Sequence, residues 1–365
     1  MNKNYLLIAV LMSVGMMTSC SSSDTEENTP VGNPAVVSLE LNGKAMTRSA
    51  ASDGEATISG GQAAAFDASG AIVGTVQSFL TSTSTTPTVK TTTQATQVSV
   101  VANPGTTASL SFGSILNKGG LEAVKTDLAS TTADVKQPKS QDPTKLPKYG
   151  NSSVDFSTNT SVDQPVDMYN LVGKIKLNPI VIDFGGTAYD GANFEPKEVF
   201  LYDANTTSTF GGIGSDPQSG ENTIKTGDDY AVIDPNSFYY LSSGVISSTT
   251  GTYTFYTFPN TSTTNPTKIV IKGAFTPKDG LPVLVYYPIV INRFQTGTVI
   301  KKGGTQLDEA DANDSKIVKS TSYDVTITIK GKGVDSPASN ISPASATITM
   351  NVKDWTDYTQ EVTVK

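Results

Sequence analysis

Few residues of this 365-residue chain have side chains that do covalent or metal chemistry: it has no histidine, one cysteine (Cys20) and two arginines. Ser-His and Cys-His nucleophile pairs and imidazole general bases are therefore excluded, as are zinc sites of nitrogen and sulfur. Carboxylates and lysines remain, but in no recognisable catalytic motif. The acidic run from Asp308 to Asp314 lacks the glycine and terminal glutamate of a calcium-binding hand, so a solvated loop is predicted there. We expect no enzyme, no cofactor and no metal.

Cys20 ends an N-terminal segment that is built like a secretion signal. Lys3 gives it a positive start, residues 5–17 are apolar but too few to span a bilayer, and small residues lead into the cysteine. The pattern resembles a bacterial lipoprotein signal, which implies a signal peptide of residues 1–19 and lipid on the Cys20 thiol. The alternatives are a plain secretion signal or a buried cysteine.

The composition predicts many strands joined by turns. Charged residues make up 16% of the chain, Gly and Pro number 31 and 19, and Val, Ile, Tyr and Phe occur in short runs. The net charge of -8 argues against a nucleic-acid partner. The length after the signal suffices for two domains. We place their boundary at Asn178-Pro179, which gives domains of residues 49–178 and 179–365, after a tether and first strand in residues 20–48.

The first periodic segment after the signal alternates as a half-buried strand does. Val37, Leu39 and Leu41 fall on one face, and polar residues occupy the other. A connector of small and polar residues follows and contains Arg48. Exposed connectors of this kind are preferred sites of proteolysis, and an arginine gives a trypsin-like enzyme its anchor. The sequence therefore predicts a cut between Arg48 and Ser49.

Most of the remaining chain also reads as strands. One region differs, because the spacing of Leu121, Val124 and Leu128 predicts a short amphipathic helix over residues 121–130. Seven strands are predicted in the second half, at residues 197–202, 252–258, 268–275, 282–291, 323–330, 346–352 and 358–364. Since no helix is long enough to cover a sheet, the sheets must cover each other as β-sandwiches.

Several segments, taken in order, resemble the fimbrillin family, the type V pilins of Bacteroidales. They are the lipoprotein signal, the Thr47-Arg48 pair after the first strand, and residues 168–177, 256–260, 323–333 and 348–355. The resemblance implies two transthyretin-like β-sandwiches. It also implies an outer-membrane lipoprotein precursor that an arginine-specific protease cuts after Arg48. The cut protein then becomes a subunit of a cell-surface fimbria that supports adhesion to a host or bacterial surface.

In such families the first strand leaves with the lipid, and a C-terminal strand of another subunit fills the groove. Physical reasoning agrees, because an edge strand removed from a sandwich exposes backbone groups and apolar pockets to a strand supplied in trans. A head-to-tail contact of this kind does not close, so it builds a homopolymeric filament. Two segments show the required alternation: Ile348, Met350 and Val352, and nearer the end Val362 and Val364. The alternative is that both are internal strands of the second sandwich.

Two other functions stay open at this point. A surface glycan-binding lipoprotein would keep its lipid and present aromatic residues on a flat face. An anchor subunit of a similar pilus would keep the Cys20 lipid. A tip subunit would lack a donor strand. Arg48 argues against an anchor, and the long C-terminal segment argues against a tip.

Overall fold

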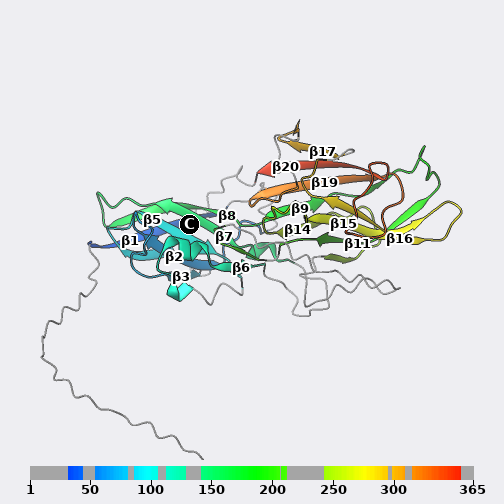
Figure 1. Cartoon of the computed structure of the whole chain (residues 1–365). Coiled ribbons are helices and arrows are strands. Elements are labelled where there is room, and N and C mark those ends of the chain that lie inside the picture. The colour runs from blue at the N-terminus through cyan, green and yellow to red at the C-terminus, as the bar shows by residue number, and fades with distance from the viewer. Residues whose placement is uncertain are drawn as a thin grey trace, which may run out of the picture.

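The protein consists of two β-sandwiches placed end to end (Figure 1). A computed structural model describes residues 32–43, 54–80, 86–105, 112–128, 141–205, 207–211, 242–294, 298–308 and 315–354. Helical structure in these ranges is limited to α1 (Lys118–Glu122) and two 3-10 turns, at Phe112–Ser114 and Pro143–Lys145. The predicted all-β fold of sandwich domains, with one short helix in the first, is therefore confirmed.

The first sandwich is a continuous series of seven strands that folds into two layers. The strands follow in space as β3 (Gln77–Leu80), β2 (Gly60–Phe66), β5 (Gln97–Ala102), β7 (Lys148–Ser153), β8 (Ser161–Asn170), β1 (Pro34–Gly43) and β4 (Thr88–Thr92). β8 connects the layers, since Tyr169 and Asn170 pair with β7 whereas the preceding residues pair with β1. Between the layers lies a core of small aliphatic side chains, among them Val37, Val98 and Val166.

The second sandwich packs a larger sheet on a four-stranded one. The larger sheet contains β14 (Tyr253–Thr257), β9 (Gly173–Leu177), β19 (Thr321–Ile329), β20 (Ala346–Asp354), β17 (Thr298–Lys302) and β18 (Thr305–Gln306), with β10 (Val181–Ile182) beside β19. The smaller sheet contains β13 (Ser242–Val245), β11 (Asn193–Tyr202), β15 (Lys268–Thr276) and β16 (Val283–Val290). Alternate apolar residues of both sheets form the core, in which the rings of Phe194 and Tyr287 meet edge to face at 5.1 Å.

The two sandwiches are joined by more than the chain that links them. β12 (Thr207–Thr209) pairs with β6 (Lys125–Asp127) in a two-stranded sheet. Tyr256 and Phe258 of the second half bury their side chains in a cluster with Phe112 and Leu121 of the first half. The side-chain amide of Gln141 exchanges two hydrogen bonds with the main chain of Tyr256, at 2.6 and 2.7 Å. The junction is therefore a packed interface.

The predicted helix differs from the observed element. α1 covers residues 118–122, capped at its start by the Asn117 side chain, which accepts a hydrogen bond from the Gly120 N–H at 2.8 Å. Leu121, Val124 and Leu128 are all buried, as their spacing indicates. The prediction of a helix to residue 130 was wrong, because β6 takes up part of that segment and pairs with β12.

The passage between the sandwiches comes earlier than the predicted boundary. Residues 166–177 belong to two strands, since they form the end of β8 and the whole of β9. β9 pairs with β14 and β19, so it belongs to the second sandwich. The chain therefore crosses at Leu171 and Val172, before Asn178-Pro179. Six of the seven strands predicted in the second half are present, and the seventh lies outside the described residues.

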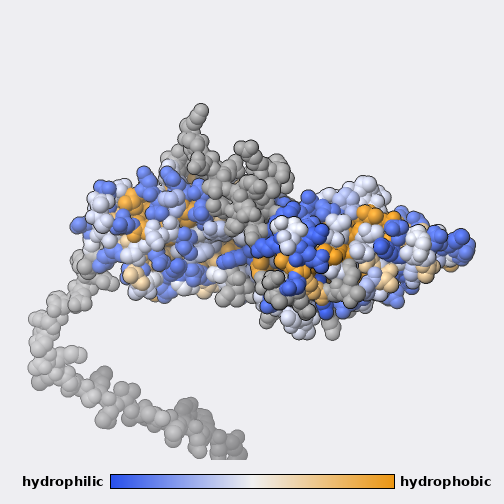
Figure 2. Space-filling model, turned by 90° about the horizontal axis from the view of Figure 1, so that it is seen from above, coloured by the Kyte–Doolittle hydropathy of each residue, from blue (hydrophilic) through white to orange (hydrophobic). Residues whose placement is uncertain are grey.

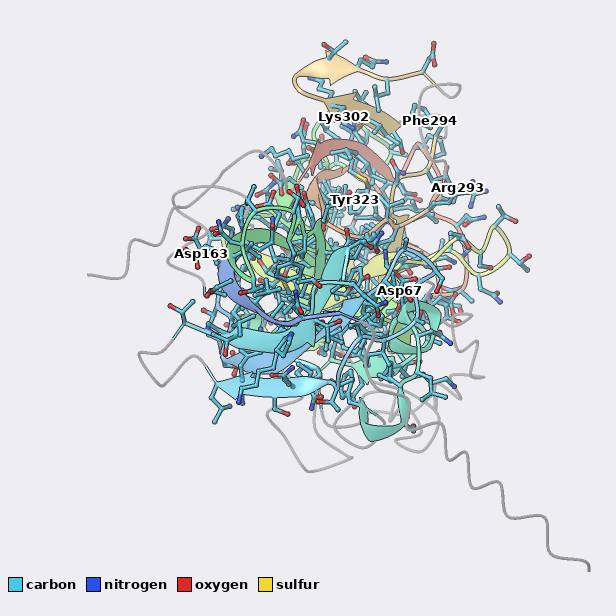
Figure 3. The ribbon with its side chains drawn as sticks, turned by 90° about the vertical axis from the view of Figure 1, so that its left-hand side faces the viewer. Asp67, Asp163, Arg293, Phe294, Lys302 and Tyr323 are labelled. Carbon is cyan, nitrogen blue, oxygen red and sulfur yellow. The ribbon has the colours of Figure 1, made fainter. Side chains whose placement is uncertain are left out.

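The visible surface carries hydrophobic residues in small groups among hydrophilic ones (Figure 2). Seen end-on from the first sandwich, the β17–β18 hairpin extends away from the rest of the second sandwich and carries Lys302, whereas Tyr323 lies within the fold (Figure 3). No helix among the described residues is both long and apolar enough to cross a membrane.

Candidate functional site

The candidate site is β1 and the groove that holds it. β1 lies between two neighbours, since it pairs antiparallel with β4 and parallel with β8. It is therefore an interior strand of its sheet, and the sequence-based description of it as an edge strand was wrong. Pairing on both sides means that removal of β1 would leave two rows of unpaired backbone groups, one on each neighbour.

The side chains of β1 alternate between the core and the surface. Val37 and Leu39 are 0% and 1% exposed, Leu41 is half-buried, and Glu40 between them is exposed. Ala35 is also buried, so the groove holds four apolar side chains of β1, one at every second residue from Ala35 to Leu41. This arrangement agrees with the predicted alternation of the segment.

Opposite these side chains the groove is largely apolar. Val89 of β4 stands directly across from Val37, and Val166 of β8 across from Leu41. Both valines are 0% exposed and belong to the same core cluster as β1. The groove therefore favours apolar side chains at these positions, and the buried Thr91 stands across from Ala35.

The predicted C-terminal residues separate into two groups. Ile348, Met350 and Val352 lie in β20, which pairs with β19 on one side and β17 on the other, and their side chains are buried in the core of the second sandwich. Within this subunit they are internal-strand residues, which is the alternative that the sequence left open. Val362 and Val364 lie outside the described residues, as do Cys20, Arg48 and Ser49.

One buried polar cluster escaped the sequence analysis. Glu55 comes from the segment before β2, Lys148 from β7, Asn170 from β8, Lys174 from β9 and Tyr256 from β14. The Glu55 carboxylate accepts from Lys174 Nζ at 2.5 Å and from the Tyr256 hydroxyl at 2.5 Å. Through hydrogen bonds, the cluster thus links the residues just before β2 to both sandwiches. The sequence signal for it is weak, because Lys148 begins a mostly polar strand and only Lys174 lies among apolar strand residues.

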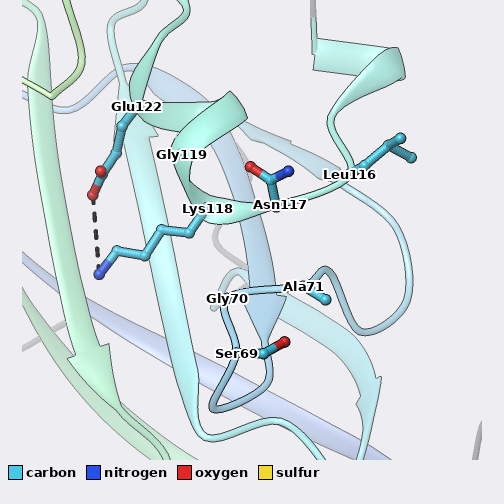
Figure 4. A pocket seen from close by; sticks show the side chains of 8 residues that line it. All are labelled: Ser69, Gly70, Ala71, Leu116, Asn117, Lys118, Gly119 and Glu122. Carbon is cyan, nitrogen blue, oxygen red and sulfur yellow. Dashed lines mark ion pairs between the residues drawn. The ribbon is translucent and has the colours of Figure 1, made fainter.

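A shallow hollow lies beside α1 (Figure 4). Its polar side chains are engaged within the fold. Lys118 Nζ lies 3.9 Å from Glu122 Oε1 and donates to Gln97 Oε1 at 3.1 Å, and Glu122 Oε1 also accepts from the Tyr149 hydroxyl at 2.8 Å. Asn117 caps α1. We therefore assign no ligand to this hollow. In the described part of the chain no three acidic or thiol side chains gather where a metal ion could bind.

The fold is similar to that of several solved proteins. A candidate cell adhesion protein from Bacteroides eggerthii matches with 22% identity and a TM-score of 0.60, over 88% of this chain and 98% of the other. A fimbrilin from Porphyromonas gingivalis matches with 17% identity and a TM-score of 0.59, over 89% and 99%. A candidate cell adhesion protein from Parabacteroides distasonis matches with 16% identity and a TM-score of 0.61, over 88% and 99%.

No protein-family model matches the chain, and no curated protein matches its sequence significantly. The three solved proteins are described as a fimbrilin and candidate adhesion proteins rather than as enzymes. Each is covered almost completely, so the likeness extends over both sandwiches. The chain therefore has the fold of the fimbrilins, as its sequence resemblance predicts.

Proposed function

We propose that this protein is a structural subunit of a cell-surface fimbria. It is exported as a lipoprotein through Cys20 and matured by an arginine-specific protease that cuts between Arg48 and Ser49. The observation that supports this most is the position of β1: a strand with a fully apolar buried face ends at Gly43, and Arg48 follows five positions later. A cut there separates β1 from the rest of its own sandwich while leaving the other strands of that sandwich on one chain.

The vacated groove is filled by the C-terminal segment of another subunit. We assign this role to Val362 and Val364, because Ile348, Met350 and Val352 already hold the second sandwich together. Each subunit then offers one groove and one strand, so assembly proceeds head to tail and gives an open filament. The partners are further copies of this chain, the protease, the outer membrane in the precursor and a surface ligand of the fibre.

The energetics suit a durable fibre. Burial of one Val, Leu or Ile side chain contributes about 1.5–3 kcal/mol. Three or four such side chains, together with backbone hydrogen bonds along both neighbours, give on the order of 10 kcal/mol before the cost of association. The same contacts hold β1 in its own groove. The cut alone therefore does not release β1, and an incoming strand has to compete with it.

Electron microscopy of surface fibres tests the proposal. The Arg48→Ala variant is expected to accumulate as a folded, lipid-bound monomer without fibres, and Arg48→Lys is expected to do the same if the protease requires arginine. The matched control is Arg293→Lys, which changes the only other arginine and is expected to leave fibres intact. Normal fibres built from the Arg48→Ala variant would contradict the proposal, whereas a parent protein that stays uncut at Arg48 in cells would favour a surface lipoprotein such as a glycan-binding protein.

A further inference from the structure

The buried polar cluster at the junction contains a lysine and an asparagine in direct contact. Lys148 and Asn170 stand opposite each other in the antiparallel β7–β8 pair. Side chains at such positions project from the same face with their Cβ atoms about 5 Å apart. Lys148 Nζ donates a hydrogen bond to Asn170 Oδ1 and another to the main-chain oxygen of Glu55, the latter at 2.6 Å. An amine therefore rests against the carbonyl group of an amide.

The site is closed to solvent. Glu55 and Lys148 are 0% exposed, and Asn170 is 1% exposed. Burial disfavours a charged ammonium group and lowers the pKa of Lys148 to about 7, although the nearby Glu55 charge acts in the opposite direction. A substantial fraction of this lysine is consequently a neutral amine at neutral pH, which is the nucleophilic form.

Glu55 supplies a buried carboxylate whose negative charge acts on this amine. Its Oε1 accepts from Lys174 Nζ and from the Tyr256 hydroxyl, so both groups hold the carboxylate in place. Its Oε2 is buried and has no hydrogen-bond partner. A buried acceptor without a partner is costly, and such atoms call for an explanation in chemistry or function. Here Glu55 Oε2 lies in the same buried cluster as the Lys148 amine and the Asn170 amide.

We propose that Lys148 and Asn170 become joined by an intramolecular amide bond. The neutral Nζ attacks Cγ of Asn170, the Cγ–Nδ2 bond breaks, and ammonia leaves. One proton passes from Nζ to Nδ2, so ammonia leaves neutral, and the buried Glu55 carboxylate stabilises the positive charge that develops on the attacking nitrogen. The step uses only groups of this cluster and needs neither an oxidant nor a reductant. It is an autocatalytic modification that follows folding, since Glu55 and Lys148 are 93 positions apart in the chain.

The cross-link would join β7 to β8 at the point where the chain leaves the first sandwich. Asn170 ends β8, and β9 of the second sandwich begins three residues later. β8 also forms one wall of the β1 groove. If the protein is a fimbrial subunit, as proposed above, tension between neighbouring subunits runs along β8 into β9, and the cross-link resists separation of β8 from β7.

Peptide mass mapping of the purified full-length chain, denatured before digestion with trypsin, tests the proposal. A cross-linked Lys148 is not cut, so we expect a single peptide of residues 146–174 that is lighter than its sequence by one ammonia, about 17 Da. Cleavage of this peptide after Met168 with cyanogen bromide should leave its two parts joined. Recovery of residues 149–174 as a separate peptide of full mass would overturn the proposal, whatever the variants do.

Three variants separate this chemistry from a purely structural role of the cluster. Lys148→Arg should show no loss of mass. Asn170→Asp should lose one water, about 18 Da, in place of ammonia, because a carboxyl group then reacts with the amine. Glu55→Gln should stay unlinked while its melting curve remains cooperative. A folded Glu55→Gln protein that forms the link as completely as the parent would remove Glu55 from the proposed step.

Discussion

Val37 in the first strand stands directly opposite Val89 in β4, and both side chains are completely buried. A segment that precedes the predicted cut site therefore contributes to the hydrophobic core of a domain that follows it. The uncut chain completes its own sandwich, which gives a stable precursor. A chain that has lost the segment has an unfilled groove, which gives a subunit ready to accept a strand. The same contacts thus account for both proposed states.

Leu39→Ala should destabilise the uncut protein. Leu39 is 1% exposed within the first core, and truncation of such a leucine costs about 2–5 kcal/mol. Glu40→Ala is the matched control, because Glu40 is exposed on the opposite face and its replacement should change stability by less than about 0.5 kcal/mol. Chemical denaturation of both variants measures the difference. Equal stabilities would mean that β1 does not contribute to the core.

Cys20→Ala should abolish lipid attachment and stall processing of the precursor. The thiol is the only one in the chain, so no other cysteine can take the lipid. Metabolic labelling with a radioactive fatty acid measures the modification. Label on the Cys20→Ala variant, or its absence from the parent protein, would contradict the lipoprotein interpretation of the N-terminal segment.

Val362→Asp, or deletion of Tyr358–Lys365, should abolish polymerisation and leave the melting curve of the cleaved monomer unchanged. An aspartate on the inserted face loses apolar burial and adds a desolvation cost. Thr363→Asp is the matched control on the opposite face and should be tolerated. If the deletion variant forms normal fibres, or if its monomer unfolds, the donor lies elsewhere.

Val352→Asp should act differently from Val362→Asp. Val352 is 8% exposed in β20 and packs in the second core, so a charge there should unfold the monomer itself. A melting curve of the variant decides between the two segments. A monomer of normal stability that fails to polymerise would return the donor role to β20.

Asp203→Asn should raise the melting temperature at pH 7. Burial raises the pKa of Asp203 to about 6, although Lys268 acts in the opposite direction. Between pH 4 and pH 6 the unfolded chain loses this proton first, so Asp203 reduces stability as the pH rises through that window. Asparagine avoids the cost and tolerates the positive φ of 55° at this position. The gain should disappear below pH 4, and a gain that persists there would have another cause.

The sequence predicted those elements whose signal is local. β1 and β20 were recognisable because a half-buried strand places an apolar side chain at every second position, and both show this over four positions. Leu121, Val124 and Leu128 were correctly predicted to be buried. The helix that was to bury them was not found at its predicted length, because β6 pairs with β12 some 80 residues away, and such pairing leaves no mark on the local pattern.

Only part of the candidate site could be predicted from the sequence, for the same reason. The apolar face of β1 is a local feature, but its interior place depends on β8, more than 100 residues later. Sequence alone also could not choose between β20 and the chain end as the donor, since both alternate, and only the pairing of β20 with β17 and β19 distinguishes them. The contact of Lys148 with Glu55 and Asn170 needs three separate segments to meet, which no spacing rule predicts.

The N-terminus of the subunit in assembled fibres tests the central claim most directly. Mass spectrometry of subunits from fibres shed by cells that express the full-length chain should find Ser49 as the first residue, with neither β1 nor lipid attached. Subunits that begin at a lipid-modified Cys20 and retain β1 would contradict the account, because the groove would then still hold its own strand.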